Sequence, residues 1–204
     1  MKGKEYEMKK KLALIIIHEI YGVNDHMKHV VTHFTSPKID VFCPNLLQFP
    51  SSFHYDEEEK AYTYFIQHVG FHYGKERIEE VITTLSNSYT HIGIIGFSVG
   101  ATIAWLCSDN PNVNFIIGCY GSRIRDYLQL KPTCPTFLIF PEKEPNFSVS
   151  SLITTFKQLE HPLLQIKQFP GEHGFLNPYT LKYNAQSTKQ VYTILDSFLL
   201  KNMF

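Results

Sequence analysis

The chain has 204 residues, the length of one typical domain, and this is enough for a single hydrophobic core. Its composition is 44% hydrophobic and 19% charged, which places it in the globular class and excludes disordered and fibrous proteins. The 19 basic and 19 acidic residues give a formal charge of zero, so no net charge attracts nucleic acid or anionic lipid.

The sequence predicts a cytoplasmic protein that does not bind membranes. No apolar run reaches the roughly 20 residues that span a bilayer. The basic residues 1–11, which we expect to form a flexible terminus, lead only into the short apolar run 12–17, and no signal-peptide cleavage site follows. The cysteines lack CxxC spacing and fit reduced thiols better than disulfides or a zinc site: Cys43, Cys107, Cys119 and Cys134.

Short apolar runs alternate with longer amphipathic stretches, which is typical of an α/β sheet. In chain order we predict strand 12–17, helix 23–34, strand 39–42, helix 76–85, strand 92–97, a helix rich in small residues after position 98, strands 114–119 and 135–140, helix 148–159, strand 163–169 and helix 181–200. These elements predict one α/β domain over 1–204, with a mostly parallel central sheet and helices on both faces. Segment 46–73 is compatible with strand or helix, and we interpret it either as a wall of a substrate pocket or as a surface excursion.

One short motif indicates catalytic chemistry. Gly96, Ser98 and Gly100 form the pattern GxSxG between a buried strand and a predicted helix. At such a bend the serine hydroxyl points outward from a strained backbone, and the glycines let strand and helix approach closely. The helix start directs N–H groups toward a developing oxyanion, with the Val99 N–H as first donor. The alternative is a serine that only caps a helix.

A serine nucleophile needs a base within hydrogen-bond reach and a group that orients the base. His173 is the candidate base, because it lies in a glycine-flanked loop after the last predicted strand, at the sheet edge where α/β folds bind ligands. The orienting acid is expected after the preceding strand, where Glu144 is the first choice and Glu142 the alternative. The order Ser98, Glu144, His173 is that of the α/β-hydrolases.

A second oxyanion donor is expected in the loop after the first strand, with the Ile20 N–H as first choice and Tyr21 as the alternative. Glu19 stands beside this donor, and we expect hydrogen bonds to hold its carboxylate away from the oxyanion; otherwise it is a partly exposed loop acid. The candidates for lining the substrate pocket are Glu19, Tyr21, Tyr120 and Phe175.

The chain resembles the dienelactone hydrolase family of α/β-hydrolases over about Leu12 to Phe198. The resemblance rests on the order and spacing of the segments 17–24, 41–46, 94–100, 118–121 and 173–175. It implies a serine or cysteine triad hydrolase that cleaves ester or lactone bonds, with Glu19 near the nucleophile and backbone donors from Ile20 and Val99.

Several positions depart from the enzymes that name the family. Those enzymes have a cysteine nucleophile, where this chain has Ser98, and a triad aspartate, where it has Glu144. They also hold the substrate carboxylate with two arginines, where it has Glu58 and Asn177. We therefore expect an ordinary esterase with poor turnover of anionic substrates. If anionic lactones are the best substrates, another cation must serve, with the candidates Arg123 and Arg125.

No other pattern indicates a cofactor. His26, His29 and His33 have helical spacing, which we interpret as a solvated helix face rather than a metal site. No phosphate-binding glycine loop occurs, so we expect neither a cofactor nor a metal.

The sequence predicts a serine hydrolase that cleaves small carboxylic esters or lactones through an acyl-enzyme. One alternative is a thioesterase or acyltransferase with the same machinery. Another is a hydrolase fold that binds a ligand or partner without turnover. The oligomeric state stays open.

Overall fold

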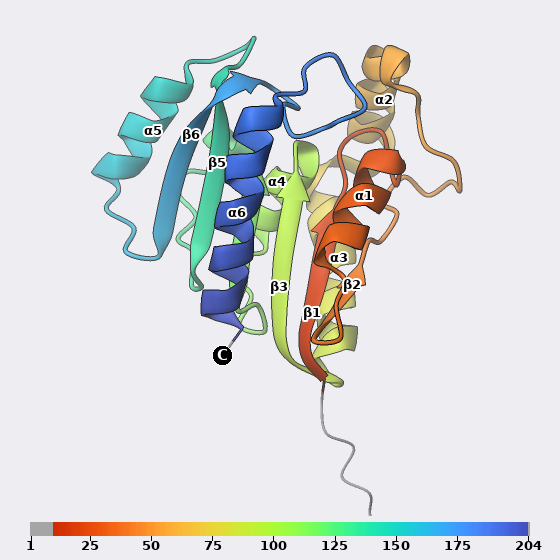
Figure 1. The fold of residues 1–204 in the computed structure, drawn as a ribbon, viewed down its shortest axis with the longest axis vertical. Coiled ribbons are helices and arrows are strands. Elements are labelled where there is room, and N and C mark those ends of the chain that lie inside the picture. The colour runs from red at the N-terminus through yellow and green to blue at the C-terminus, as the bar shows by residue number, and fades with distance from the viewer. Residues whose placement is uncertain (1–9, 204) are drawn as a thin grey trace, which may run out of the picture.

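The computed structural model describes residues 10–203, which are organised around a six-stranded sheet (Figure 1). All strand pairs of this sheet are parallel, and the strand order is β2-β1-β3-β4-β5-β6. The strands are β1 (Lys10–Ile17), β2 (Ile39–Phe42), β3 (Tyr89–Phe97), β4 (Phe115–Cys119), β5 (Thr136–Lys143) and β6 (Leu164–Glu172). Because the chain adds β2 on one side of β1 and β3 on the other, a crevice is expected where β1 and β3 end.

Helices cover both faces of the sheet. They are α1 (Asp25–Phe34), α2 (Glu58–Tyr64), α3 (Gly70–Ser86), α4 (Val99–Leu106), α5 (Val149–Gln158) and α6 (Ala185–Asn202). The apolar sides of α1 and α6 pack on one face, while α3 and α4 pack on the other. A third cluster joins α5 to Trp105 of α4 and to the β5 side chains Leu138 and Phe140.

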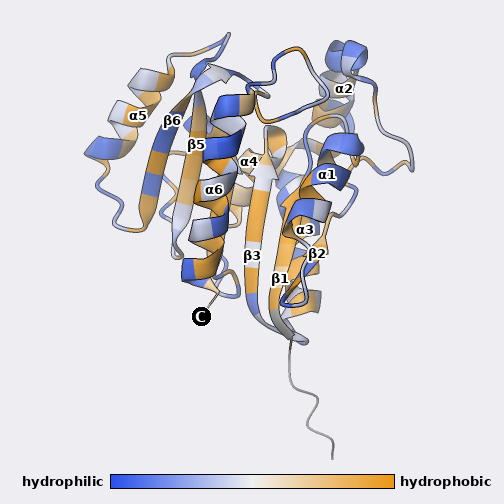
Figure 2. Cartoon of the chain, viewed as in Figure 1, coloured by the Kyte–Doolittle hydropathy of each residue, from blue (hydrophilic) through white to orange (hydrophobic). Residues whose placement is uncertain are grey.

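The central strands are apolar on both faces, as Figure 2 shows for β1 and β3. In β1, Leu12, Leu14 and Ile16 join the cluster under α1 and α6, whereas Ala13, Ile15 and Ile17 join the cluster under α3 and α4. Side chains alternate along a strand, so a strand covered on both sides must be apolar at every position. This is why a continuous apolar run marks the centre of the sheet.

The predicted α/β fold with a central parallel sheet is confirmed. Segment 46–73 is helical where it is regular, with a short turn at Tyr55–Glu57, then α2 and a π-helical turn at Phe65–Val69. α6 begins four residues later than predicted, at Ala185, because Asn184 caps it by accepting a hydrogen bond from the Ser187 N–H. The predicted flexible terminus lies outside the described residues, except that Lys10 and Lys11 belong to β1. Within 10–203, no helix combines the length and the apolar character that a membrane span requires.

α4 packs unusually close to β1 and β3. A Cβ atom on Gly100 would lie 2.3 Å from the carbonyl oxygen of Ile17, and one on Gly96 would lie 2.1 Å from the carbonyl oxygen of Gly100. Both obstacles are backbone atoms that no side-chain rotation can move. The two glycines of the motif are therefore required by the strand–helix contact.

We predict that Gly100→Ala lowers the free energy of unfolding by about 2 kcal/mol, because the new methyl group must push α4 away from β1. Gly74→Ala is the matched control: its Cβ meets only the side-chain end of Ile103, and alanine favours the α3 helix. Urea unfolding measures both changes. Equal stability of the two variants would contradict the proposed backbone contact.

Candidate active site

Ser98 forms the turn between β3 and α4. Its φ of 54° lies in a region that residues other than glycine rarely adopt, so the turn is strained. Two sets of backbone hydrogen bonds hold it: the Ser98 N–H donates to the carbonyl of Cys119 over 2.9 Å, and the Ser98 carbonyl accepts from Ala101 and Thr102. The neighbouring strand and the first turn of α4 therefore fix the position of the hydroxyl.

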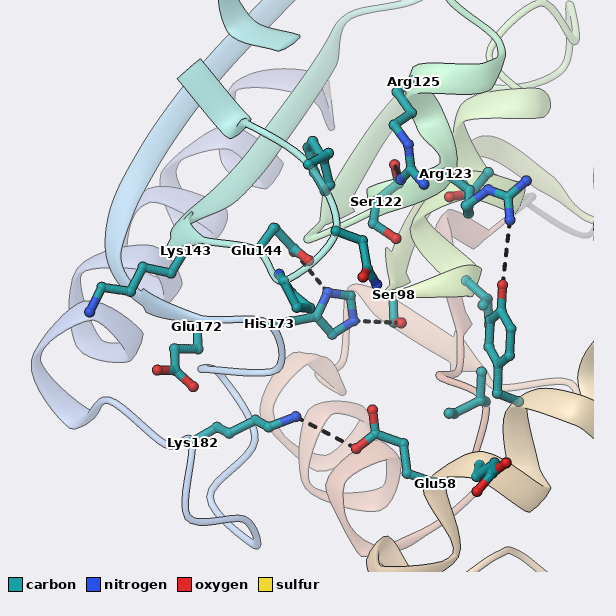
Figure 3. Close-up of a pocket in the computed structure, with 18 residues that line it drawn as sticks. Glu58, Ser98, Ser122, Arg123, Arg125, Lys143, Glu144, Glu172, His173 and Lys182 are labelled. Carbon is teal, nitrogen blue, oxygen red and sulfur yellow. Dashed lines mark hydrogen bonds and ion pairs between the residues drawn. The ribbon is translucent and has the colours of Figure 1, made fainter. Parts of the chain in front are cut away.

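His173 follows β6 and joins Ser98 to Glu144 (Figure 3). Its Nε2 lies 2.8 Å from Ser98 Oγ, and its Nδ1 lies 2.8 Å from Glu144 Oε1. An ionised carboxylate only accepts hydrogen bonds, so Nδ1 carries the proton and Nε2 accepts from the serine hydroxyl. The structure therefore brings together the three side chains that the sequence predicts as nucleophile, base and acid.

The pairing of β5 with β6 explains why Glu144 rather than Glu142 meets His173. Pairing between β5 and β6 is regular up to Pro141 and Phe169, then shifts so that Lys143 pairs with Glu172. Glu142 is exposed, whereas the side chain of Glu144 is only 2% exposed. β6 therefore contains one extra residue between these two pairs, and continuing the shifted register puts His173 level with Glu144.

The two residues expected to supply oxyanion donors, Ile20 and Val99, line the same cavity as Ser98. Val99 is the first residue of α4, so its N–H has no acceptor within the helix. The Glu19 carbonyl is held by the Gly22 N–H over 3.2 Å and by His18 Nδ1 over 2.6 Å. In a trans peptide the N–H points opposite to the C=O, so these contacts fix the direction of the Ile20 N–H.

The His18 ring is locked in one tautomer. It is buried and its Nε2 accepts from the Leu46 N–H over 2.9 Å, which leaves the proton on Nδ1 for the Glu19 carbonyl. Burial lowers the pKa of His18 more than its contacts with Glu19 raise it, so the ring stays neutral. His18 thus acts as a rigid clamp on the Glu19–Ile20 peptide.

A cavity of about 760 Å³ opens over Ser98. Its walls contain Ile20 and Val99, the three side chains Ser98, Glu144 and His173, and further charged side chains from several elements. These further charged residues are Glu58, Glu59, Arg123, Arg125, Lys143, Glu172 and Lys182. Glu58 is paired with Lys182 over 3.6 Å, and Arg123 is paired with Asp126. Segment 46–73 contributes Glu58, Glu59 and Tyr62 to the wall.

The four residues expected to line the pocket do not line this cavity. Glu19, Tyr120 and Phe175 are buried behind it, because they belong to the packed layer between the sheet edge and the following loops. Tyr21 is half-buried and turned toward Tyr55, with ring centroids 5.0 Å apart. The residues that take their place come from α2, from the turn Ser122–Asp126 after β4 and from the loop after β5.

The Glu19 carboxylate is held by hydrogen bonds from three side chains. Its Oε1 accepts from the Tyr120 hydroxyl over 3.0 Å, while Oε2 lies 3.3 Å from His26 Nδ1 and 3.4 Å from Asn177 Nδ2. Burial alone would raise the pKa of Glu19. The charge and hydrogen bond of His26, the Tyr120 hydroxyl and the charge of His173 lower it by more, so the net pKa is below the usual value. Glu19 is therefore an ionised buried carboxylate.

His26 corrects the expectation of a solvated histidine face. Its side chain is buried against Phe97, at 5.3 Å between ring centroids, whereas His29 and His33 point outward from the same helix. Among residues 10–203 no group of three His, Cys, Asp or Glu side chains is arranged to hold a metal ion.

Comparisons with known proteins agree with this architecture. Residues 2–202 match the model of the dienelactone hydrolase family. The chain is 44% identical over 174 residues to the uncharacterized protein YczH of Bacillus subtilis (strain 168), which covers 85% of each chain.

Solved structures resemble the fold at low sequence identity. A dienelactone hydrolase-like promiscuous phosphotriesterase from metagenomic libraries matches with a TM-score of 0.74 and 12% identity, over 97% of this chain and 89% of that one. Est1E of Butyrivibrio proteoclasticus, bound to ferulic acid, matches with a TM-score of 0.69 and 12% identity, over 98% and 92%. At these identities the likeness shows the α/β-hydrolase fold.

We predict that Glu144→Gln slows the labelling of Ser98 by a fluorophosphonate by about 100-fold or more, because an amide cannot hold the imidazole in the required tautomer. Glu142→Gln, two residues away and exposed, should label at the wild-type rate. Intact-protein mass spectrometry over time gives both rates. The reverse ranking would assign the acid to Glu142.

Proposed function

Because the chain belongs to the dienelactone hydrolase family, whose members hydrolyse esters and lactones, we propose that it cleaves small carboxylic esters or lactones through a Ser98–His173–Glu144 triad. The observation that carries the proposal is the pair of 2.8 Å contacts that joins these side chains at the floor of the cavity. The positive φ of Ser98 supports the interpretation of this turn as a nucleophile elbow.

The proposed reaction proceeds through an acyl-enzyme. His173 Nε2 takes the Ser98 proton as Oγ attacks the acyl carbon, and the Val99 and Ile20 N–H groups hold the oxyanion. The imidazolium gives its proton to the leaving alkoxide, and the carbon–oxygen bond of the ester breaks. His173 then takes a proton from water, the hydroxide attacks the acyl carbon, and the proton returns to Ser98 as the acid leaves.

The size and the charged lining of the cavity favour a small polar substrate. Its volume of about 760 Å³ lies within the usual range for small-molecule sites. Glu58 and Asn177 stand at the two positions where the resemblance expects arginines. Glu58 lines the cavity, whereas Asn177 contacts Glu19 behind it. Arg123 and Arg125 lie on the opposite wall from Glu58, on the turn after β4 (Figure 3).

We predict that Ser98→Ala loses both the hydrolysis of p-nitrophenyl butyrate and the mass increase of one adduct after fluorophosphonate treatment. The residual rate should be lower by at least about 1,000-fold, as expected when the nucleophile of a triad is removed. Unchanged turnover in this variant would refute the proposal. A wild-type protein that gains no adduct would support a silent binding protein instead.

Iodoacetamide should leave the activity unchanged, because the cysteines are unreactive. Burial raises the pKa of Cys43 to about 12 and that of Cys134 to about 11, and it also raises the pKa of Cys107 and Cys119. A thiol reacts as its thiolate, which these shifts suppress near neutral pH. Time-dependent inactivation by iodoacetamide would contradict a serine nucleophile.

A further inference from the structure

Tyr120 adopts a backbone conformation that is rare for a large side chain. It has a φ of 46° directly after β4 and is fully buried. Phe97 and Cys119 are opposite each other in the β3–β4 register, so Ser98 and Tyr120 leave neighbouring strands at the same level. Strain of this kind persists only where the surroundings enforce it, and it concentrates at functional sites.

The Tyr120 ring contacts both segments that carry the reacting side chains. It packs edge to face with His173, with centroids 5.1 Å apart, and lies 6.1 Å from the ring of Phe97, the residue before Ser98. It also lies 5.9 Å from Phe175, two residues after His173. At its other end the hydroxyl donates to Glu19. One side chain thus spans from the buried carboxylate to the imidazole.

We propose, on the basis of the proposed triad, that Tyr120 is a positioning residue for His173 and that Glu19 acts through it. Glu19 fixes the Tyr120 hydroxyl, and the Tyr120 ring in turn supports the imidazole in the orientation that faces Ser98. The negative charge of Glu19 also favours the protonated imidazole that forms when His173 takes the serine proton. Glu144 contacts the imidazole directly, whereas Glu19 acts on it through the Tyr120 side chain that lies between them.

Among the groups that face His173, Glu19 is the carboxylate that adds a negative charge to that of Glu144. His173 is faced by Ser98 after β3, Tyr120 after β4, Glu144 after β5 and, through its charge, Glu19 after β1. Glu19 in turn is faced by His26 of α1 and by Asn177 of the loop before α6. The phenols and the thiol that sense its charge stay neutral because burial raises their pKa: Tyr21, Tyr55, Cys119, Tyr120 and Tyr192.

The first test compares two conservative changes in the full chain with p-nitrophenyl butyrate as substrate. Tyr120→Phe keeps the ring but removes the contact with Glu19, so kcat should fall about tenfold with KM within about twofold. Tyr192→Phe is the matched control, because Tyr192 is buried in the same core and its hydroxyl has no hydrogen-bond partner among the described residues. Equal kcat values for the two variants would overturn the positioning role of Tyr120.

The second test measures the charge of Glu19. Glu19→Gln keeps the shape and removes the charge, so the acidic limb of the kcat/KM profile should move to lower pH, because the negative charge beyond the Tyr120 ring is gone. A purely structural role would lower the melting temperature without moving this limb, and an unmoved limb overturns the electrostatic role. The wild-type adduct on Ser98 separates these outcomes from failure of the proposed function, because it depends on the triad alone.

Discussion

The whole site depends on the contact between α4 and the two central strands. A helix that begins one residue after a strand reverses the chain within a single turn, and only a positive φ at Ser98 and bare backbone at Gly96 and Gly100 permit this. The strain is offset by burial of α4, whose residues Val99 to Trp105 are all inaccessible to solvent or nearly so. A serine held in this way points its hydroxyl into the cavity without having to be ordered by a substrate.

The parallel sheet brings distant residues to this hydroxyl. His173 is 75 residues from Ser98 and 29 from Glu144, yet all three follow the carboxyl ends of strands in one sheet. That arrangement could be predicted from the sequence, because continuous apolar runs mark buried parallel strands and the residues after them must gather at one edge. The same reasoning predicts the N–H groups of Ile20 and Val99 as oxyanion donors, because each residue follows a strand that can be recognised from its apolar run.

Other features depend on details that no pattern records. The choice between Glu142 and Glu144 depends on an extra residue in β6 that shifts its pairing with β5, and both residues look alike as surface glutamates in a proline-flanked loop. Glu58 and Tyr62 reach the cavity only because segment 46–73 turns into α2, which a mixture of aromatic and acidic residues did not indicate. His26 is buried because α1 turns that position toward Phe97, although Asp25, Lys28 and His29 of the same helix are exposed.

In the proposed mechanism, Glu19 must meet two opposite electrostatic demands. An oxyanion beside its own peptide would be repelled by its carboxylate, whereas an imidazolium at His173 would be stabilised by it. The backbone and the side chain of Glu19 are directed apart: His18 holds the carbonyl so that the Ile20 N–H is fixed, and Tyr120, His26 and Asn177 hold the carboxylate on the other side. A shorter aspartate could not easily reach the same donors, so the length of the glutamate side chain itself becomes part of the geometry that keeps the two charges apart.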